Sequence, residues 1–313
     1  MVNKVLCILN PNSSKGKGSE YKTRIEKEFS LFDIETSFDF SLYKGHAIEI
    51  AREGVRKGFD TIVCCGGDGA VNEVINGIMQ EGKQTKLGII PIGRGNDLAW
   101  SLKISTDIKK AVAIIASGKT RCIDLGYLKG DESPGGRYFA NGAGLGFEAI
   151  INSKASSFKH ISGMPSYFLS LLSSLVTLPC PYSLSLNVDG EERKVTSQQL
   201  SLSNGRRMGA GFLLGPYAKL DDGLLDLSYA NRAVRHVELL GLVIAFIRGR
   251  QLELDLMDYK RVKRVCINTE GEGMMVQADG EEIGQKMKHL SVEVVPSAIN
   301  IYVKLETKEI MVK

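Results

Sequence analysis

The residues with the strongest chemical signature lie in the stretch CCGGDGAVNEVINGI at positions 64–78. It places Gly66, Gly67, Asp68 and Gly69 between an apolar run and a segment whose apolar residues recur at helical spacing. Glycines permit a tight turn and close approach of a ligand, and the first N–H groups of a helix attract an anion. Asp68 would repel a phosphate unless its carboxylate acts through Mg²⁺ or water. The stretch therefore predicts a nucleotide site with a metal.

Spacing alone leaves a plain tight turn nearly as good an interpretation, because the stretch matches neither GxGxxG nor GxxxxGK[ST]. Two further loops favour the site. NPNSSKG at 10–16 follows the run VLCIL, and PIGRGND at 91–97 follows LGII. Ligands bind at the carboxyl edge of a parallel sheet, where three such loops are expected to converge.

Two regions with different patterns must position these loops. From Lys4 to about Gly126, apolar runs alternate with helical segments expected at 20–29, 46–57, 72–80 and 108–117, which indicates βαβ units and a mostly parallel sheet. From about Arg137, short alternating runs between turn signals favour an antiparallel sandwich or barrel, with helices at 161–177 and 234–248. We predict an α/β domain at 1–128 and a β-sandwich domain at 129–313, with the last strand allowed to return to the first domain.

Composition excludes several classes of protein. The 313 residues carry a net charge of +4 with no basic block, so nucleic acid is not an expected partner. No apolar run reaches the roughly 18 to 20 residues that span a bilayer, and the N-terminus predicts a buried strand rather than a signal peptide, so the mature chain is expected to start at Met1. Six cysteines without CxxC pairs indicate free thiols in a reducing cytosol.

A resemblance to a known family covers almost the whole chain. It is carried, in order, by NPNSS, GGDGAVNEVINGI, PIGRGNDLAW, ANGAGLGFEA, GPYAKLDDGLLDL and ADGEE. These segments resemble the diacylglycerol kinase catalytic-domain family, which includes soluble bacterial diacylglycerol kinases and related sphingolipid kinases. The resemblance implies an α/β nucleotide-binding domain similar to phosphofructokinases and NAD kinases, and a β-sandwich domain that supplies the lipid site. It also implies ATP and Mg²⁺ as cofactors and a diacylglycerol-like membrane lipid as the acceptor.

The resemblance further implies roles for individual residues. The expected nucleotide site comprises Asn10, Ser41, Gly66, Gly67, Asp68, Gly69, Ala70, Val71, Asn72, Glu73, Gly93, Arg94, Gly95 and Asn96, with Asp97 in the same wall. Glu73 is expected to support the glycine loop. A structural Mg²⁺ is expected at Asp222 with the main-chain carbonyls of Lys219 and Leu224. The general base is expected in Asp279-Gly280-Glu281, as Asp279 or Glu281, while Asp68 acts beside the triphosphate.

Each of these assignments has a structural alternative. Asp221-Asp222-Gly223 is also typical of a turn between strands. Asp-Gly-Glu occurs at 189–191 as well as at 279–281, and Asp-Gly between alternating strands is a type I′ hairpin signal, so the first copy is interpreted as a hairpin only. Asp124 fits a structural carboxylate between the domains or a site residue equally well, and His46 is interpreted as a loop anchor.

The chain departs from the family pattern at two positions. The family usually has threonine after GGDG and often threonine or serine after PxG, where this sequence has Ala70 and Arg94. If Ala70 is the N-cap, half of a capping box with Glu73 is lost, at a cost of about 0.5 to 2 kcal/mol. Arg94 could compensate through bidentate contacts to phosphate, or block the adenine or ribose pocket. We expect nucleotide binding to survive with altered affinity.

The expected activity is ATP-dependent phosphorylation of the free hydroxyl of diacylglycerol or a similar lipid, giving a phospholipid such as phosphatidic acid. The alternatives are a sphingoid-base or NAD-type metabolite kinase, or a catalytically weak nucleotide- or lipid-binding regulator. The expected location is the cytoplasm, with transient contact at the inner face of the membrane. A homodimer through exposed sandwich edges is left open.

Overall fold

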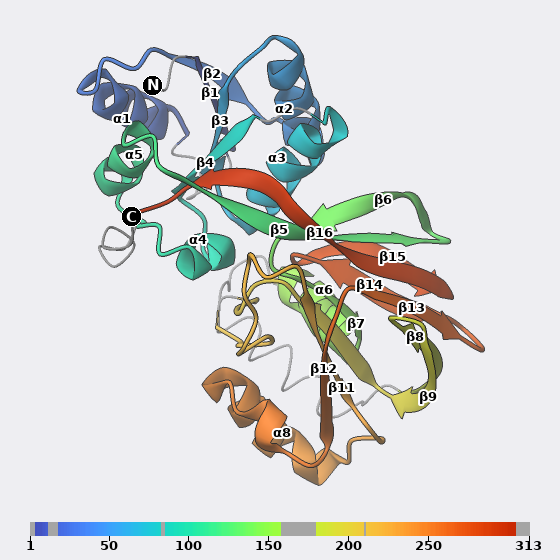
Figure 1. Cartoon of the computed structure of the whole chain (residues 1–313). Helices are drawn as coiled ribbons and strands as arrows, with labels where there is room; N and C mark the ends of the chain where they lie inside the picture. Colours follow the sequence, from blue (N-terminus) through green and yellow to red (C-terminus); the bar gives the residue numbers. More distant parts are fainter. Residues whose placement is uncertain (1–3, 12–17, 83–84, 158–179, 210, 305–313) are drawn as a thin grey trace, which may run out of the picture. The chain divides into compact units, whose positions relative to one another are not determined.

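The chain forms two compact units. The computed structural model describes residues 4–11, 18–82, 85–157, 180–209 and 211–304 (Figure 1). The first unit comprises Met1–Ile123 and Ser297–Lys313, and the second comprises Asp124–Pro296. The chain therefore passes between the units twice, and the predicted boundary between residues 128 and 129 falls within strand β5 (Thr120–Gly130).

The sheet of the first unit is parallel. Its strands are ordered β2-β1-β3-β4-β16, with bounds β1 (Val5–Leu9), β2 (Thr36–Phe40), β3 (Thr61–Gly66), β4 (Lys86–Pro91) and β16 (His289–Tyr302). Strands β1 and β3 are buried along their whole length, as expected for a parallel sheet covered on both faces. The end of β16 pairs with β4 through Ile301 and Leu87, and the Tyr302 hydroxyl lies 2.8 Å from Thr61 Oγ1.

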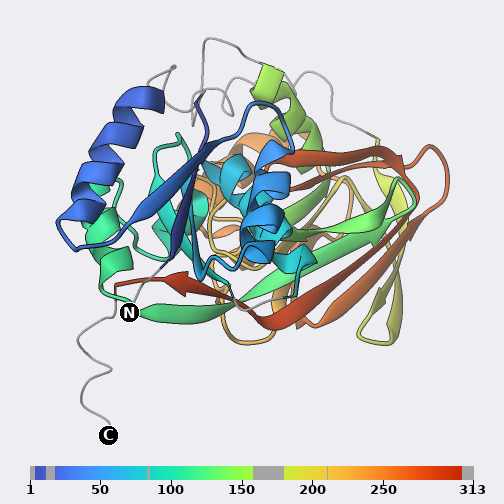
Figure 2. The ribbon, with the colours of Figure 1, turned by 90° about the horizontal axis from the view of Figure 1, so that it is seen from above.

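Helices cover both faces of this sheet. They are α1 (Gly18–Ser30), α2 (His46–Arg56), α3 (Asp68–Gln80), α4 (Asp97–Ser101) and α5 (Ile108–Ala116). Helices α1 and α5 lie on one face and α2 and α3 on the other (Figures 1 and 2). Helices α2 and α3 pack so closely that a Cβ atom on Gly77 would lie 2.4 Å from the Ile48 carbonyl oxygen. The four predicted helices are confirmed, but α3 begins four residues before the expected start at Asn72.

The second unit is an antiparallel sandwich. One sheet has the order β12-β11-β10-β7-β14-β15, and the other pairs β16 with β13, β13 with β8 and β8 with β9, while β5 pairs with β16 and β6. The bounds are β6 (Ser133–Phe139), β7 (Gly142–Gly146), β8 (Tyr182–Val188), β9 (Glu191–Ser197), β10 (Gln199–Ser203), β11 (Leu225–Ala230), β12 (Met257–Val262), β13 (Arg264–Thr269), β14 (Met274–Ala278) and β15 (Glu281–Met287). Side chains such as Leu186 of β8 and Leu202 of β10 share one buried core, which confirms the expected sandwich.

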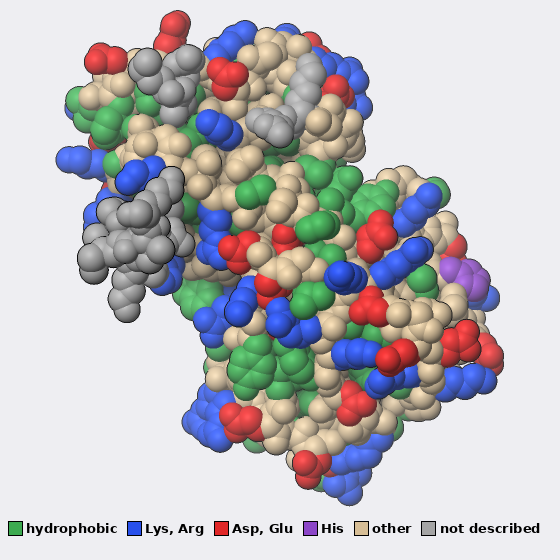
Figure 3. All heavy atoms as spheres, in the orientation of Figure 1, with side chains coloured by type: hydrophobic (Ala, Val, Ile, Leu, Met, Phe, Trp, Pro, Cys, Tyr) green, Lys and Arg blue, Asp and Glu red, His purple; other side chains and the backbone are tan. Residues whose placement is uncertain are grey.

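In the described part of the second unit, two α-helices accompany the sandwich. Helix α6 (Phe147–Ser157) follows β7, and α8 (His236–Arg248), close to the predicted 234–248, is followed by a short 3₁₀ helix at Gln251–Glu253. The predicted helix at 161–177 lies outside the described residues. No helix in the described part of the chain has the length and apolar character needed to cross a bilayer. On the face drawn in Figure 3, basic and acidic side chains are interspersed rather than gathered into one charged patch.

Candidate functional site

The carboxyl ends of the first four parallel strands bring several predicted residues to one edge of the sheet. Asn10 follows β1 and donates its backbone N–H to the Cys65 carbonyl at 3.3 Å. Ser41 follows β2 and donates its N–H to the Leu9 carbonyl at 3.1 Å. Ile92 donates to the Gly66 carbonyl at 3.1 Å, so the loops after β3 and β4 are adjacent. The remainder of the first loop, at 12–17, lies outside the described residues.

The glycines of the two adjacent loops are required by their close approach. A Cβ atom added to Gly93 would lie 2.2 Å from the Gly67 Cα atom, and one added to Gly67 would lie 3.1 Å from the Gly93 Cα atom. Any side chain at Gly93 would therefore push the loops apart. The Asn96 side chain closes the second loop by accepting from the Gly93 N–H at 3.1 Å and donating to the Gly93 carbonyl at 2.9 Å.

The start of α3 differs from the prediction. Gly67 is the N-cap, in an extended conformation with φ −100° and ψ −170°, and no side chain caps the helix. The expected turn across residues 66–69 is therefore shorter, since the helix already begins at Asp68. The first turn leaves the N–H groups of Asp68, Gly69 and Ala70 without acceptors inside the helix, which is the usual basis of a phosphate site. Ala70 is the third helical residue, so the condition for the lost capping box, an N-cap at Ala70, is not met.

The later residues of the stretch face away from this edge. Val71 is 5 % exposed and belongs to the core, and Asn72 is 1 % exposed and accepts from the Asn76 side chain. Glu73 accepts from the N–H groups of Gly45 at 2.8 Å and Ala47 at 3.2 Å. Glu73 thus holds the start of α2 rather than supporting the glycine loop, because its helical position points it toward α2.

His46 lies in that same turn. Its Nδ1 accepts from the Leu42 N–H at 3.0 Å, and its ring stacks on Tyr43 with centroids 4.4 Å apart. These contacts confirm the interpretation of His46 as a loop anchor.

Asp68 connects the two glycine loops. Its Oδ1 atom accepts from the Asp97 N–H at 2.6 Å, at the start of α4. Asp97 is 4 % exposed, whereas Arg94, between the two loop glycines, is exposed. The edge therefore combines helical N–H donors, a carboxylate and a nearby guanidinium. Such a set suits a phosphate chain with an associated cation.

The AKLDDG segment of the second unit is organised by Asp124. Asp124 Oδ2 accepts from the Gly223 N–H at 2.7 Å, and the Asp124 N–H donates to the Leu220 carbonyl at 2.6 Å. Of the two interpretations of Asp124, these contacts favour the structural one. Asp222, the expected Mg²⁺ ligand, forms an ion pair with Arg261, and its Oδ1 atom accepts from the Leu224 N–H at 3.2 Å. Asp222 thus meets a cation from its own chain.

Both Asp-Gly-Glu copies form tight hairpins. Asp189 and Gly190 connect β8 to β9 with φ values of 51° and 95°. Asp279 and Gly280 connect β14 to β15 with φ values of 48° and 85°. Two consecutive residues with positive φ are the type I′ signature predicted for Asp-Gly.

The Asp279 carboxylate is buried in a backbone cradle. Its Oδ2 atom accepts from the Ala140 N–H at 2.8 Å, and its Oδ1 atom accepts from Asn141 at 2.7 Å and Gly142 at 3.1 Å. Asp279 is 6 % exposed, while Glu281 at the start of β15 is partly exposed. Three backbone N–H groups thus donate to the Asp279 oxygens, whereas the Glu281 side chain is less buried.

An apolar pocket opens beside this hairpin. It is formed by α6, α8, strands β10 and β14 and the segment around Met208. The walls are apolar, and the polar lining is confined to four side chains. The described lining residues are Phe147, Glu148, Ile151, Asn152, Gln199, Met208, Gly209, Phe212, Leu214, Leu239, Leu242, Val243, Phe246 and Gln277. Pockets lined in this way, by apolar walls with a few polar groups, accommodate apolar small molecules with a polar end.

Glu148 is the one titratable residue among the described residues that line the pocket. Its carboxylate accepts from the Ser201 hydroxyl and, at 2.8 Å, from the Gln277 side-chain amide. Burial raises the pKa of Glu148 to about 7, and these two hydrogen bonds oppose that rise. Gly144 makes room for the carboxylate, because a Cβ atom there would lie 2.3 Å from Glu148 Oε1.

The polar end of the pocket is tied to the second hairpin. Gln277 Oε1 accepts from the Gly280 N–H at 2.8 Å, and the Asn152 side chain donates to the Gly280 carbonyl at 2.6 Å. The pocket and the turn that carries Glu281 thus form one connected arrangement within the second unit. The sequence prediction missed Glu148, Ser201 and Gln277. The available signal was a lone glutamate in the apolar, glycine-rich run GAGLGFEAII.

Comparison with known proteins is consistent across both units. Residues 4–128 match the diacylglycerol kinase catalytic domain, and residues 142–303 match the YegS C-terminal NAD kinase beta sandwich-like domain. A diacylglycerol kinase of Bacillus subtilis is 30 % identical over 278 residues, which cover 88 % of each chain. A diacylglycerol kinase of Mycobacterium tuberculosis is 36 % identical over 230 residues, 72 % of each chain.

A solved structure shows the same fold. The crystal structure of a diacylglycerol kinase from Bacillus anthracis superposes with a TM-score of 0.71 over 96 % of this chain and 97 % of that chain, at 21 % identity. At this identity the structural likeness supports the fold, while the sequence matches support the family. Together they show that the chain belongs to the diacylglycerol kinase catalytic-domain family and is a lipid kinase, a phosphotransferase.

Proposed function

We propose that this lipid kinase transfers the γ-phosphate of ATP to the free hydroxyl of diacylglycerol or a similar lipid, giving a product such as phosphatidic acid. The observation that carries the proposal is the apolar pocket whose polar end is bonded to the Asp279-Gly280 turn. This arrangement suits an acceptor with apolar chains and a single reactive head. The names of the two related diacylglycerol kinases agree with diacylglycerol as that acceptor.

The nucleotide is assigned to the first unit. The N–H groups of the first turn of α3 would bind the phosphates, and Gly67 and Gly93 leave the space that lets the chain approach them. Asn10, Ser41, Gly95 and Asn96 lie at the ends of the same strands or in the adjacent loop, and stay predicted contacts. Arg94 replaces the hydroxyl that the family usually has there, and its guanidinium is suited to bidentate phosphate contacts.

Mg²⁺ fits the carboxylate of Asp68 beside the phosphates. Among the described residues, no group of three or more His, Cys, Asp or Glu side chains gathers as a metal site. Mg²⁺ typically needs only one or two protein carboxylates because phosphate oxygens and water complete its shell. Its chemistry there would be neutralisation of the charge on the transferring phosphoryl group.

In the transfer step, the lipid hydroxyl oxygen bonds to the γ-phosphorus as the bond to the ADP oxygen breaks. The hydroxyl proton passes to a carboxylate, for which Glu281 is the better placed of the two predicted candidates. Asp279 holds the turn that carries Glu281 through its three backbone contacts. Glu148 and Gln277 orient the lipid head from the end of the pocket.

The test measures ADP release with Mg·ATP over a panel of acceptors in mixed micelles: diacylglycerol, a sphingoid base and NAD. Turnover with diacylglycerol is the expected result. Turnover with the sphingoid base or NAD alone would replace the proposed acceptor, and calorimetry without detectable Mg·ATP or Mg·ADP binding would contradict the nucleotide assignment.

The structural Mg²⁺ at Asp222, Lys219 and Leu224 is a separate proposal. It must account for the ion pair that Asp222 already forms with Arg261. The cation would have to replace Arg261 beside the Asp222 carboxylate. If it does, added Mg²⁺ raises the Tm of the wild-type chain and leaves that of Asp222→Asn unchanged. Equal Tm shifts in both proteins would contradict the site.

A further inference from the structure

Helix α8 is apolar on two opposite faces. Leu239, Leu242, Val243 and Phe246 are buried and line the apolar pocket. The opposite face is formed by Val237, Leu240, Gly241, Ile244 and Ile247, which we call the α8 outer face. Its four apolar side chains are 83 %, 59 %, 42 % and 38 % exposed, in chain order. Residues 239–247 contain no charged residue at all. A helix that is apolar all around is normally covered on every side.

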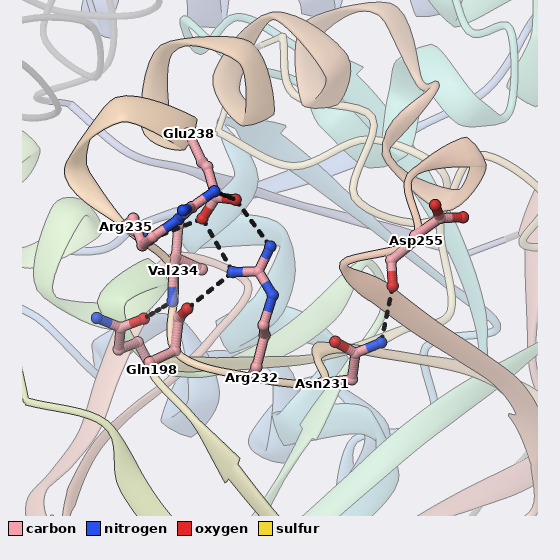
Figure 4. Close-up of polar contacts among 8 residues, drawn as sticks. Gln198, Asn231, Arg232, Val234, Arg235, Glu238 and Asp255 are labelled. Carbon is pink, nitrogen blue, oxygen red and sulfur yellow. Dashed lines mark hydrogen bonds and ion pairs between the residues drawn. The ribbon is translucent and has the colours of Figure 1, made fainter.

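Both ends of α8 are held firmly, so its exposure does not arise from a loose segment. At the start, Glu238 accepts from the Arg235 N–H at 3.0 Å and from the guanidinium groups of Arg232 and Arg235 at 2.7 Å and 2.8 Å (Figure 4). Gln198 Oε1 accepts from the Val234 N–H at 2.6 Å in the same region (Figure 4). These contacts fix the rotation of the helix about its axis.

The far end is fixed in the same manner. Gly249 ends the helix with φ 68°, and Arg250 donates its N–H to the Ala245 carbonyl at 2.8 Å. The buried Gln251 side chain donates to the Leu213 carbonyl at 2.6 Å. The α8 outer face is therefore a rigid apolar surface.

The charges around α8 indicate what covers this surface. Residues 231–253 contain four arginines, at 232, 235, 248 and 250, against two glutamates, at 238 and 253. The arginines flank the apolar stretch at both of its ends. Arg232 and Arg235 pair with Glu238, and Arg250 pairs with Glu253, so four arginines against two glutamates leave the segment with a net charge of +2. A short helix with an exposed apolar face and net positive flanks is suited to lie in the plane of an anionic lipid surface. At 13 residues, α8 is too short to span a bilayer.

We propose that the α8 outer face docks on an anionic lipid bilayer. The inference rests on the proposed lipid acceptor, because the same helix lines the pocket assigned to that acceptor. Docking through α8 brings the wall of the pocket against the membrane that holds the lipid. A lipid then moves from bilayer to pocket past a single helix, without exposure of its chains to water.

The experiment compares Gly241→Asp with Gly241→Leu in the full chain, by co-sedimentation with vesicles of phosphatidylglycerol and phosphatidylcholine. A Cβ atom on Gly241 meets nothing within 4 Å. Both replacements favour helix over glycine, so neither lowers the Tm. We expect the aspartate to lower the vesicle partition coefficient about tenfold and the leucine to raise it by a similar factor.

Two controls sharpen the comparison. Leu31→Asp places the same charge in the first unit, at a leucine that is 64 % exposed, close to the 59 % of Leu240 on the α8 outer face. This variant is expected to leave the vesicle partition coefficient unchanged. Arg248→Glu is expected to weaken binding to vesicles with phosphatidylglycerol and to have little effect with phosphatidylcholine alone.

Equal vesicle binding by the two Gly241 variants would overturn the proposal. So would a change in their mass at sedimentation equilibrium without a change in vesicle binding, since a second copy of the chain would then cover the α8 outer face. Turnover of a short-chain diacylglycerol dispersed in detergent tests the proposed function separately. Its absence in the wild-type chain would contradict the acceptor, while the vesicle comparison still reports on α8.

Discussion

The two Asp-Gly-Glu hairpins of the second unit have nearly the same local structure and different surroundings. In each, the turn aspartate accepts N–H groups from another segment and donates its own N–H to that segment, namely to the Arg264 carbonyl from Asp189 and to the Gly142 carbonyl from Asp279. In each, an amide side chain two residues before the aspartate accepts from the turn glycine: Asn187 in the first hairpin at 3.0 Å and Gln277 in the second at 2.8 Å.

The difference begins beyond these shared contacts. Asp189 is exposed and Asp279 is buried. Glu191 forms surface ion pairs with Arg193 and Lys260. In the second hairpin, the Gln277 side-chain amide instead donates a hydrogen bond to Glu148 at the end of the apolar pocket. The comparison teaches that the Asp-Gly-Glu motif encodes only a turn. The second turn differs because its neighbouring residue Gln277 connects it to Glu148 in the apolar pocket.

The largest expected effect separates the two glutamates. Glu281→Gln removes the proposed proton acceptor, so kcat is expected to fall about 100-fold or more. Glu191→Gln removes the two surface ion pairs with Arg193 and Lys260 and is expected to leave kcat unchanged. Steady-state ADP release at saturating lipid measures both variants, with Tm as the folding control. Full activity of Glu281→Gln would remove Glu281 from the mechanism.

The two aspartates give the next largest difference. Asp279→Asn turns an amide NH₂ toward buried N–H donors, which should cost about 3 kcal/mol of the free energy of unfolding. Asp189→Asn makes the same change at an exposed turn, where water can satisfy the donors, and is expected to cost less than about 1 kcal/mol. Urea unfolding of the two variants provides the measurement. Equal losses would show that burial does not distinguish the hairpins.

The pH dependence of stability also separates the two hairpins. The second hairpin is connected through Gln277 to Glu148, a buried carboxyl group with a raised pKa. The folded carboxyl, with a pKa of about 7 against an ordinary 4.5, keeps a proton that the unfolded chain releases between those values. Stability from this residue therefore falls as pH rises through that window. Glu148→Gln cannot ionise, so its stability relative to wild type should rise by about 3 kcal/mol between pH 4.5 and pH 8.

The matched control for Glu148→Gln is Glu191→Gln, which should show no such change between the two pH values. The measurement is the denaturant midpoint of unfolding for each variant and for wild type at several pH values between 4.5 and 8. A constant difference between Glu148→Gln and wild type would contradict the titration of Glu148.

The smallest expected difference concerns the two amides. Gln277→Ala breaks the bond to Glu148 as well as that to Gly280, whereas Asn187→Ala breaks only the bond to Gly190. We expect Gln277→Ala to cost about 1 kcal/mol more and to raise the KM for lipid several-fold. If both variants keep the wild-type KM, the pocket and the turn act independently.

Much of the first unit could be predicted from local pattern. The runs VLCIL and TIVCC are apolar throughout because parallel strands are buried on both faces, and the glycine loops follow them directly. The start of α3 could not be predicted, because it depends on the extended backbone of Gly67. Glu73 was placed beside the wrong partner, since its contacts, Gly45 and Ala47, come from an earlier helix.

The pocket of the second unit could not be predicted from the sequence, for a different reason. The partners of Glu148 are Ser201 and Gln277, 53 and 129 residues further along the chain. No local spacing encodes such a contact, and a single glutamate in an apolar run has no periodicity. The Asp-Gly turns were predicted correctly because their positive φ values are a property of two adjacent residues.

The path of β16 has a consequence for the order in which the protein can be completed during synthesis. Its last residues pair with β4 and bond to Thr61, yet they leave the ribosome after all the other strands that the structure describes in the two units. Until then, the edge of β4 carries unpaired N–H and C=O groups, which are prone to pairing with other chains. The sheet of the first unit is therefore completed only after the sandwich has been translated. A fragment that stops at Ile123 would keep that edge open permanently.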